Sequence, residues 1–176
     1  MDKPIILLGA GGHAKVLIEI LVLEEREVIG YVTQNVKEKT PILGINSLGK
    51  EEKIFEYDPK DIEIVNGVGS LPGNSTRWHL DKIFSKAGYK FATLIHPSVV
   101  VGSNVSFGEG VQVMAGSIIQ PEVKIGRATI INTKCSIDHD CRIGKYCHIA
   151  PGITLSGEIE IGDLVHIGTG STVIQS

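Results

Sequence analysis

The chain has 176 residues, of which 42% are hydrophobic and 21% charged, enough for one ordinary domain or two small ones with a buried core. A net charge of -3 and an aromatic content of 5% provide no basic, base-stacking surface for nucleic acid and no basic patch for an anionic membrane. The apolar runs are too short to span a bilayer.

The first half of the chain is predicted to be a small parallel α/β domain, residues 1–92. Short apolar runs alternate with segments whose apolar residues recur at helical spacing, and this alternation is typical of a parallel sheet covered by helices. We expect strands at 5–8, 28–32 and 63–66 and helices at 14–25 and 75–87.

A glycine-rich turn, Gly9–Ala14, follows the first strand and opens the first helix. It fits the Gly-x-Gly-x-x-Ala pattern in which the backbone approaches an anion at a helix N-terminus. The acid that a nicotinamide dinucleotide site needs further on is replaced by Thr-Gln at 33–34, which disfavours that cofactor. A nucleotide-linked ligand at Gly11, Gly12 and His13 and a turn that binds nothing both remain open.

The strand predicted at 63–66 ends in a second glycine-rich turn, Gly-Val-Gly-Ser. Ligands bind at the carboxyl ends of parallel strands, and both turns are expected at the same sheet edge. Gly69 and Ser70 are therefore secondary candidates for the same ligand.

The second half of the chain repeats with a period of six. From Ile95 to Val173, fourteen successive positions spaced by six all carry a large apolar residue, without an insertion. This is the signature of a parallel β-helix, in which three hexads form one triangular coil. With no long loop, function must come from side chains on the coil surface or from the first half.

Asp138-His139-Asp140 is the sharpest chemical motif. His139 comes two residues after the apolar Ile137, at a position expected to face outwards. Flanking carboxylates orient an imidazole and make it more basic, which suits a general base. A plain surface histidine in a polar triplet is the alternative interpretation.

His148 and His166 are 18 residues apart and are expected to stack, one coil above the other. The equivalent position one coil below is Ile130, so a third metal ligand is lacking there and we expect no metal. A ligand-contacting pair and plain surface residues both remain open.

The three cysteines, Cys135, Cys141 and Cys147, occupy the small inward position of successive hexads. They are expected to be core residues on different sides of a coil rather than a metal or nucleophile cluster. Their odd number does not make a secreted disulfide framework, and the N-terminus is not a signal peptide. We therefore expect a cytoplasmic protein.

Several segments together resemble the sugar O- and N-acyltransferases, which include sialic acid O-acetyltransferases and the bacillosamine and perosamine N-acetyltransferases. The segments are 9–16 (GAGGHAKV), 96–97 (HP), 137–144 (IDHDCRIG), 148–152 (HIAPG) and 155–157 (LSG). The resemblance covers essentially the whole chain, and the Gly-Gly-His-Ala-Lys start combined with Asp-His-Asp is its most specific part.

The resemblance implies a Rossmann-like sugar-nucleotide-binding domain at 1–92 and a left-handed parallel β-helix at 93–176. It implies a homotrimer that uses acetyl-CoA, and no metal, to acetylate a sugar that is commonly nucleotide-linked, with CoA in clefts between neighbouring β-helices. We favour an amino group as acceptor, attacking directly in a ternary complex.

Matching the motifs residue by residue implies His139 as the catalytic base and Asp140 as its acidic partner. The implied coenzyme contacts are His148, Gly157 and Thr169. The implied sugar-nucleotide pocket comprises Gly11, Gly12, His13 and Gly69, to which the strand-end argument adds Ser70.

Other functions remain open at this point. They are an O-acetyltransferase for a sugar hydroxyl such as that of sialic acid, a non-catalytic sugar-nucleotide-binding trimer, a zinc-dependent carbonic anhydrase and an oxidoreductase.

Two features depart from the family. Some relatives carry paired acids where this chain has Thr33-Gln34, which leaves the nucleotide and the sugar open. Relatives also continue for several hexads beyond Ser176, so we expect C-terminal coils to be missing from this sequence.

Overall fold

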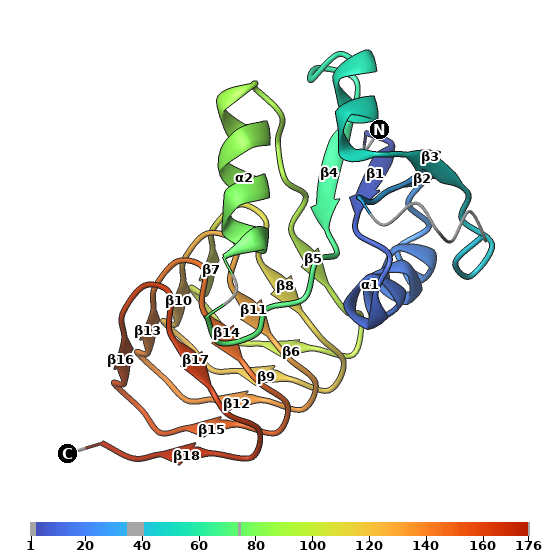
Figure 1. Ribbon diagram of the computed structural model, residues 1–176. Coiled ribbons are helices and arrows are strands. Elements are labelled where there is room, and N and C mark those ends of the chain that lie inside the picture. Colours follow the sequence, from blue (N-terminus) through green and yellow to red (C-terminus); the bar gives the residue numbers. More distant parts are fainter. Residues whose placement is uncertain (1–2, 35–40, 74, 176) are drawn as a thin grey trace. The chain divides into compact units, whose positions relative to one another are not determined.

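The computed structural model describes residues 3–34, 41–73 and 75–175. The chain divides into two compact units, Met1–Ala92 and Thr93–Ser176 (Figure 1). Neither α-helix of the described ranges has the length and apolar character needed to cross a bilayer.

The first unit is a four-stranded parallel sheet with strand order β3-β2-β1-β4. Its elements are β1 (Ile5–Leu8), α1 (Gly12–Leu23), β2 (Val28–Val32), β3 (Ser47–Gly49), the 3-10 helix η1 (Glu51–Glu56), β4 (Glu63–Asn66) and α2 (Thr76–Lys86). All four residues of β1 are buried, as expected for a central parallel strand covered on both faces. Leu80 and Phe84 of α2 join Ile6 and Leu8 in one core cluster.

Four features of this unit differ from the sequence prediction. Helix α2 is one residue shorter at each end than the expected 75–87. Helix α1 begins and ends two residues earlier than expected, and the left-handed conformation of Glu25, with a φ of 54°, fits its early end. The short strand β3 and the helix η1 were not predicted, because three residues without a β-branched side chain and a single 3-10 run carry almost no periodic signal.

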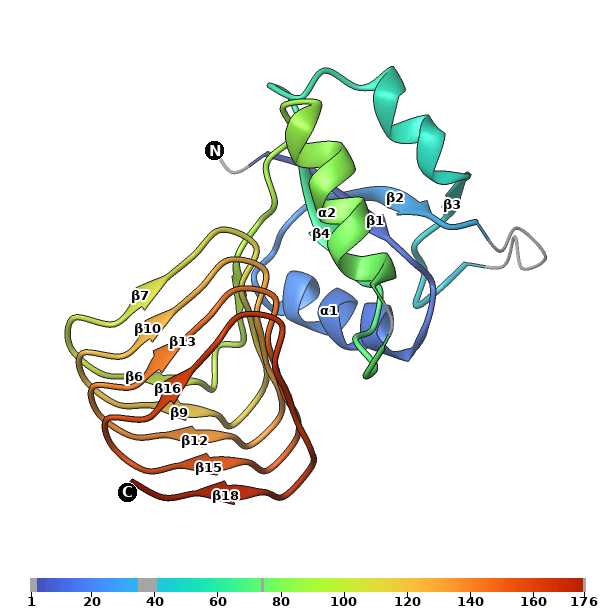
Figure 2. The same ribbon diagram turned by 60° about the vertical axis from the view of Figure 1, so that its left-hand side comes forward.

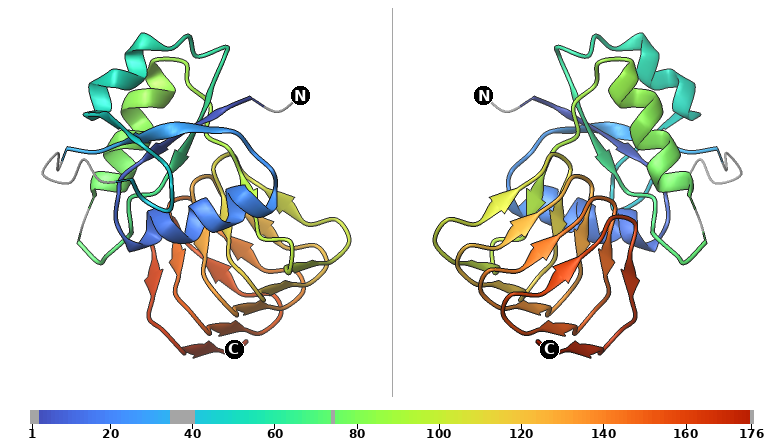
Figure 3. Two further views of the ribbon diagram at one scale, coloured as in Figure 1. Left: turned by 90° about the vertical axis from the view of Figure 1, so that its right-hand side faces the viewer. Right: turned by 90° about the vertical axis from the view of Figure 1, so that its left-hand side faces the viewer.

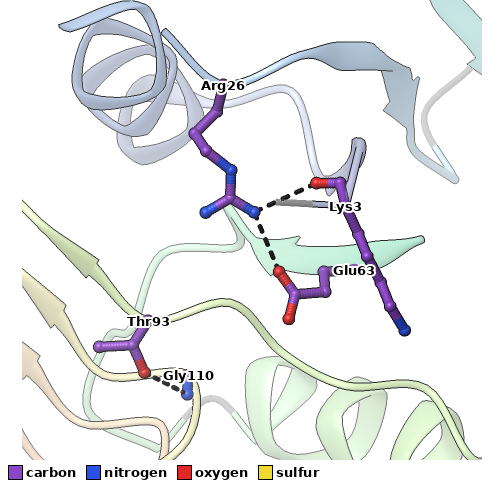
Figure 4. A network of polar contacts seen from close by, with 5 residues as sticks. All are labelled: Lys3, Arg26, Glu63, Thr93 and Gly110. Carbon is purple, nitrogen blue, oxygen red and sulfur yellow. Dashed lines mark hydrogen bonds and ion pairs between the residues drawn. The ribbon is translucent and has the colours of Figure 1, made fainter. Parts of the chain in front are cut away.

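Arg26 ties the amino edge of this sheet together. Its Nη2 atom donates a hydrogen bond to the Lys3 carbonyl at 3.2 Å and pairs with Glu63 at 2.9 Å, which joins the beginnings of β1 and β4 (Figure 4).

The second unit is a parallel β-helix with three faces, each built of two-residue strands (Figures 2 and 3). Face 1 comprises β5 (Leu94–Ile95), β8 (Gln112–Val113), β11 (Ile130–Ile131), β14 (His148–Ile149) and β17 (His166–Ile167). Face 2 comprises β6 (Val100–Val101), β9 (Ile118–Ile119), β12 (Ser136–Ile137), β15 (Thr154–Leu155) and β18 (Thr172–Val173). Face 3 comprises β7 (Ser106–Phe107), β10 (Lys124–Ile125), β13 (Arg142–Ile143) and β16 (Glu160–Ile161).

Every strand pairs with residues 18 positions away, as the hexad period predicts; Ile137, for example, lies between Ile119 and Leu155. The inward apolar residues form one continuous core. Stacking is so close at some corners that only glycine fits: a Cβ on Gly144 would lie 2.6 Å from the backbone of the next coil.

The three cysteines are core residues, as predicted. All three are buried and free, and their thiols donate to carbonyl groups of the next coil, for example Cys147 to Gly162 at 3.0 Å. Burial raises the pKa of each thiol, which keeps it protonated and a poor nucleophile.

Candidate functional site

His139 and Asp140 lie in the turn between β12 and β13, at the corner where face 2 meets face 3. Nδ1 of His139 is 2.8 Å from Oδ2 of Asp140, and each side chain is 53% exposed. The backbone N–H of His139 donates to Oδ1 of Asp138 at 2.9 Å. Asp140 has a φ of 60°, the left-handed conformation that Asp tolerates better than most residues. The local turn thus presents an oriented imidazole to solvent.

The surroundings of His139 make its ring more basic. The hydrogen bond to Asp140 contributes most to a raised pKa, the charges of Asp138, Asp140 and Glu158 add to it, and desolvation opposes it. With Nδ1–H donated to the carboxylate, the lone pair of Nε2 remains available to accept a proton. This arrangement suits general-base chemistry.

Gly157 lies one coil further along, at the same corner as His139. A Cβ added to Gly157 would lie 2.6 Å from both Cε1 and Nε2 of the His139 ring, so the ring occupies the place that a side chain at this position would take. The neighbouring Glu158 N–H donates to the His139 carbonyl at 2.9 Å. The proton-accepting edge of the imidazole is therefore held against the backbone of the next coil.

His148 and His166 stack on face 1, as predicted from their spacing. They pair in register, with ring centroids 4.7 Å apart and planes at 84°. Asn132 donates from Nδ2 to Nε2 of His148 at 3.1 Å, a contact that the sequence did not suggest. Ile130 is 1% exposed below the pair. No group of three metal-binding side chains occurs within the described ranges.

The two glycine-rich turns of the first unit lie side by side. A Cβ on Gly9 would lie 3.1 Å from the Val68 side chain, and one on Gly69 would lie 3.9 Å from Cβ of His13. Among the described residues, a Cβ added to Gly11 or Gly12, at the start of α1, would meet nothing within 4 Å. Packing within the chain does not require glycine at these two positions, and the open backbone leaves room for a ligand at the helix N-terminus.

Known proteins are similar to this chain both in its first unit and over nearly its whole length. Residues 4–83 match the family described as the PglD N-terminal domain. The acetyltransferase domain of PglB from Neisseria gonorrhoeae is similar over 97% of this chain and 82% of its own, with 29% identity and a TM-score of 0.87; the form with acetyl coenzyme A bound is equally similar. A histidine-to-asparagine variant of perosamine N-acetyltransferase from Caulobacter crescentus, with CoA and GDP-perosamine, matches 100% of this chain and 90% of its own, with 28% identity and a TM-score of 0.84.

The chain is thus similar to sugar acetyltransferases over nearly its whole length, and most of its first unit matches the PglD N-terminal domain. The parallel, regularly repeated strands of its second unit fit the left-handed β-helix of such acetyltransferases. WeeI from Acinetobacter baumannii, at 23% identity and a TM-score of 0.85, shares the fold.

The structure divides the expected site residues of this chain into three groups. His139, Asp140 and Gly157 meet at the corner of faces 2 and 3. His148 lies on face 1, and Thr169 lies exposed at the corner of faces 1 and 2. The third group comprises Gly11, Gly12, His13, Gly69 and Ser70, around the two glycine-rich turns of the first unit.

Proposed function

We propose that the protein transfers an acetyl group from acetyl-CoA to an amino group of a nucleotide-linked sugar. The observation that carries this proposal is the exposed His139, whose Nδ1 is hydrogen-bonded to Oδ2 of Asp140 at 2.8 Å and whose ring packs over Gly157. The likeness to structures that hold acetyl coenzyme A, or CoA with GDP-perosamine, supports the choice of donor and acceptor class.

The proposed reaction is a direct transfer. The neutral amine attacks the thioester carbonyl, and its proton passes to Nε2 of His139 as the C–N bond forms. The C–S bond then breaks, and the CoA thiolate takes the proton from the imidazolium. Asp140 stabilises the charged ring throughout, which is how a paired carboxylate assists a general base. Backbone N–H groups near Gly157 would stabilise the oxyanion, and no covalent acetyl-enzyme is formed.

The sugar nucleotide is proposed to bind to the first unit, acting as a Rossmann-like domain. Gly11, Gly12 and His13 at the start of α1, with Gly69 and Ser70 after β4, line the carboxyl edge of the parallel sheet. A helix N-terminus with accessible N–H groups suits a diphosphate. The match of residues 4–83 to the PglD N-terminal domain supports a role shared with that family.

A homotrimer is part of the proposal. Within one chain, the base lies with the expected coenzyme contact Gly157 at the corner of faces 2 and 3. The other two expected coenzyme contacts, His148 and Thr169, belong to different sides of the triangular β-helix. A single cleft would receive both sets if adjacent copies each contributed one of them. This separation supports CoA binding between neighbouring left-handed β-helices.

A cytoplasmic location is also proposed. It is supported by the three cysteines, which are free and buried rather than joined in disulfides of the kind found in secreted proteins.

The acceptor class is tested by thiol release from acetyl-CoA. The purified protein is incubated with acetyl-CoA and with GDP- or UDP-linked amino sugars, each beside the matched hydroxyl sugar. We expect CoA release with at least one amino sugar and none with its hydroxyl counterpart. Release with hydroxyl sugars alone would replace the N-acetyl assignment by an O-acetyl one, and no release with any acceptor would leave a binding module.

Replacing Asp140 by asparagine should change the pH dependence of the reaction. The base must be neutral to accept a proton, so kcat/KM rises as the pH passes the pKa of His139. Asp140 raises that pKa; without its charge the rising limb should move to lower pH, and the plateau should fall because the ring is a weaker base. Asp138→Asn is the matched control. The charge of Asp138 also raises the pKa of His139, but its carboxylate accepts from the backbone N–H rather than from the ring, so its shift should be smaller. An equal or larger shift in the control would contradict the helper role of Asp140.

A further inference from the structure

Arg77, the second residue of α2, is an unusual arginine. It is 6% exposed. Burial lowers its pKa to about 10, and the negative charge of Asp81, one turn further along the helix, partly opposes this shift by raising the pKa. Its guanidinium is therefore still protonated at neutral pH. Among the described residues, its Nε and Nη2 atoms have no hydrogen-bond partner. An apolar side chain would avoid this cost, so packing alone does not explain an arginine here.

The remaining nitrogen of Arg77 holds the end of β4. Nη1 donates to the carbonyl oxygens of Asn66 at 2.5 Å and of Val68 at 3.1 Å. Asn66 returns a hydrogen bond from Nδ2 to the Arg77 carbonyl at 3.1 Å, and its Oδ1 accepts from the Val68 N–H at 3.2 Å. These contacts fasten the segment Asn66–Val68 to the first turn of α2.

The fastened segment also abuts the glycine-rich turn after β1. The Gly67 N–H donates to the Leu8 carbonyl at 2.8 Å. A Cβ on Gly67 would lie 2.7 Å from that oxygen and 3.0 Å from the side chain of Ala14 in α1. A movement of this segment is therefore transmitted to the first turn of α1, where His13 lies, and to Gly69 and Ser70.

We propose that Arg77 is a positioning residue for the nucleotide-sugar subsite: it fixes the segment Asn66–Val68, and through it Gly69, Ser70 and His13, in the conformation that binds the substrate. This inference rests on the proposed function of the first unit. One nitrogen of the planar guanidinium donates to two carbonyl groups. An apolar side chain cannot donate to them, and a lysine would offer only a flexible point charge without the fixed geometry of the guanidinium.

The test compares Arg77→Met and Arg77→Lys with Arg26→Met. Arg26 is the matched control, because it is a partly buried arginine that bonds a carbonyl group at the opposite, amino edge of the same sheet (Figure 4). The first measurement is amide hydrogen exchange without ligand. Arg77→Met should exchange faster at residues 67–70 and not at residues 3–5, and Arg26→Met should show the reverse.

The second measurement is the split between kinetic constants with a nucleotide amino sugar. Arg77→Met should raise KM for that sugar by about tenfold, whereas kcat and the KM for acetyl-CoA should stay within about twofold of wild type. The KM of Arg77→Lys for the sugar should lie between those of Arg77→Met and wild type. Arg26→Met should match wild type in all three constants. Unchanged exchange at residues 67–70, or the same KM shift in the Arg26 variant, would overturn the proposal. A wild-type protein that acetylates no nucleotide sugar would refute the proposed function instead, and the exchange experiment would still decide whether Arg77 fixes the segment.

Discussion

Replacing His139 by alanine is expected to lower kcat by about 100-fold or more while leaving the affinity for acetyl-CoA close to that of wild type. The reason is that the ring accepts the proton of the attacking amine only in the transition state, so its removal costs turnover rather than ground-state binding. Steady-state kinetics with a nucleotide amino sugar and calorimetry with CoA measure the two quantities separately.

The His139 variant needs a control for folding. Its side chain is 53% exposed in a surface turn, so the melting temperature should change little. His79→Ala removes another exposed histidine, on α2, and should keep full activity. Near-normal turnover of His139→Ala would remove the assignment of the base, and a loss of similar size in His79→Ala would show that the effect is not specific to His139.

The second large effect is expected from Gly157→Ala. The added Cβ would lie 2.6 Å from Cε1 and Nε2 of His139, a distance at which the ring must turn away. Because the ring is the mobile end of a half-exposed side chain, the protein should fold normally while the base loses its position. We expect kcat to fall by about 100-fold; the affinity for CoA is measured beside it, because Gly157 is also an expected coenzyme contact.

The melting temperature of Gly157→Ala is the control for folding. It should stay close to that of wild type, because the three atoms nearest to the added Cβ all belong to the His139 ring. Full activity of Gly157→Ala would contradict the close contact between the glycine and the ring.

The hexad period predicted much of the site because a β-helix turns spacing directly into position. Residues 18 apart lie on adjacent coils, which is why the stack of His148 on His166 followed from the sequence. The same rule brings Gly157 to His139, although only the structure shows that the ring leans over the glycine. That lean depends on side-chain torsions, which spacing does not determine.

The first unit was less predictable. Its strands β1, β2 and β4 followed from buried apolar runs, and the two glycine-rich turns indicated the sheet edge at which we propose that the ligand binds. Arg77 gave no signal, because a basic residue near the start of a helix normally indicates a solvated surface. Its burial arises from hydrogen bonds to a segment 9 to 11 residues earlier in the chain, a tertiary arrangement that local patterns do not encode.

The most direct measurement mixes wild-type protein, preloaded with labelled acetyl-CoA, with a nucleotide amino sugar, and follows free CoA, acetylated sugar and the mass of the protein over time. Direct transfer with His139 as base predicts that CoA and acetylated sugar appear together in equal amounts, only when the sugar is present, with no acetyl group on the protein. Acetylated protein that forms before the product, or CoA released at the same rate without the sugar, would contradict the account.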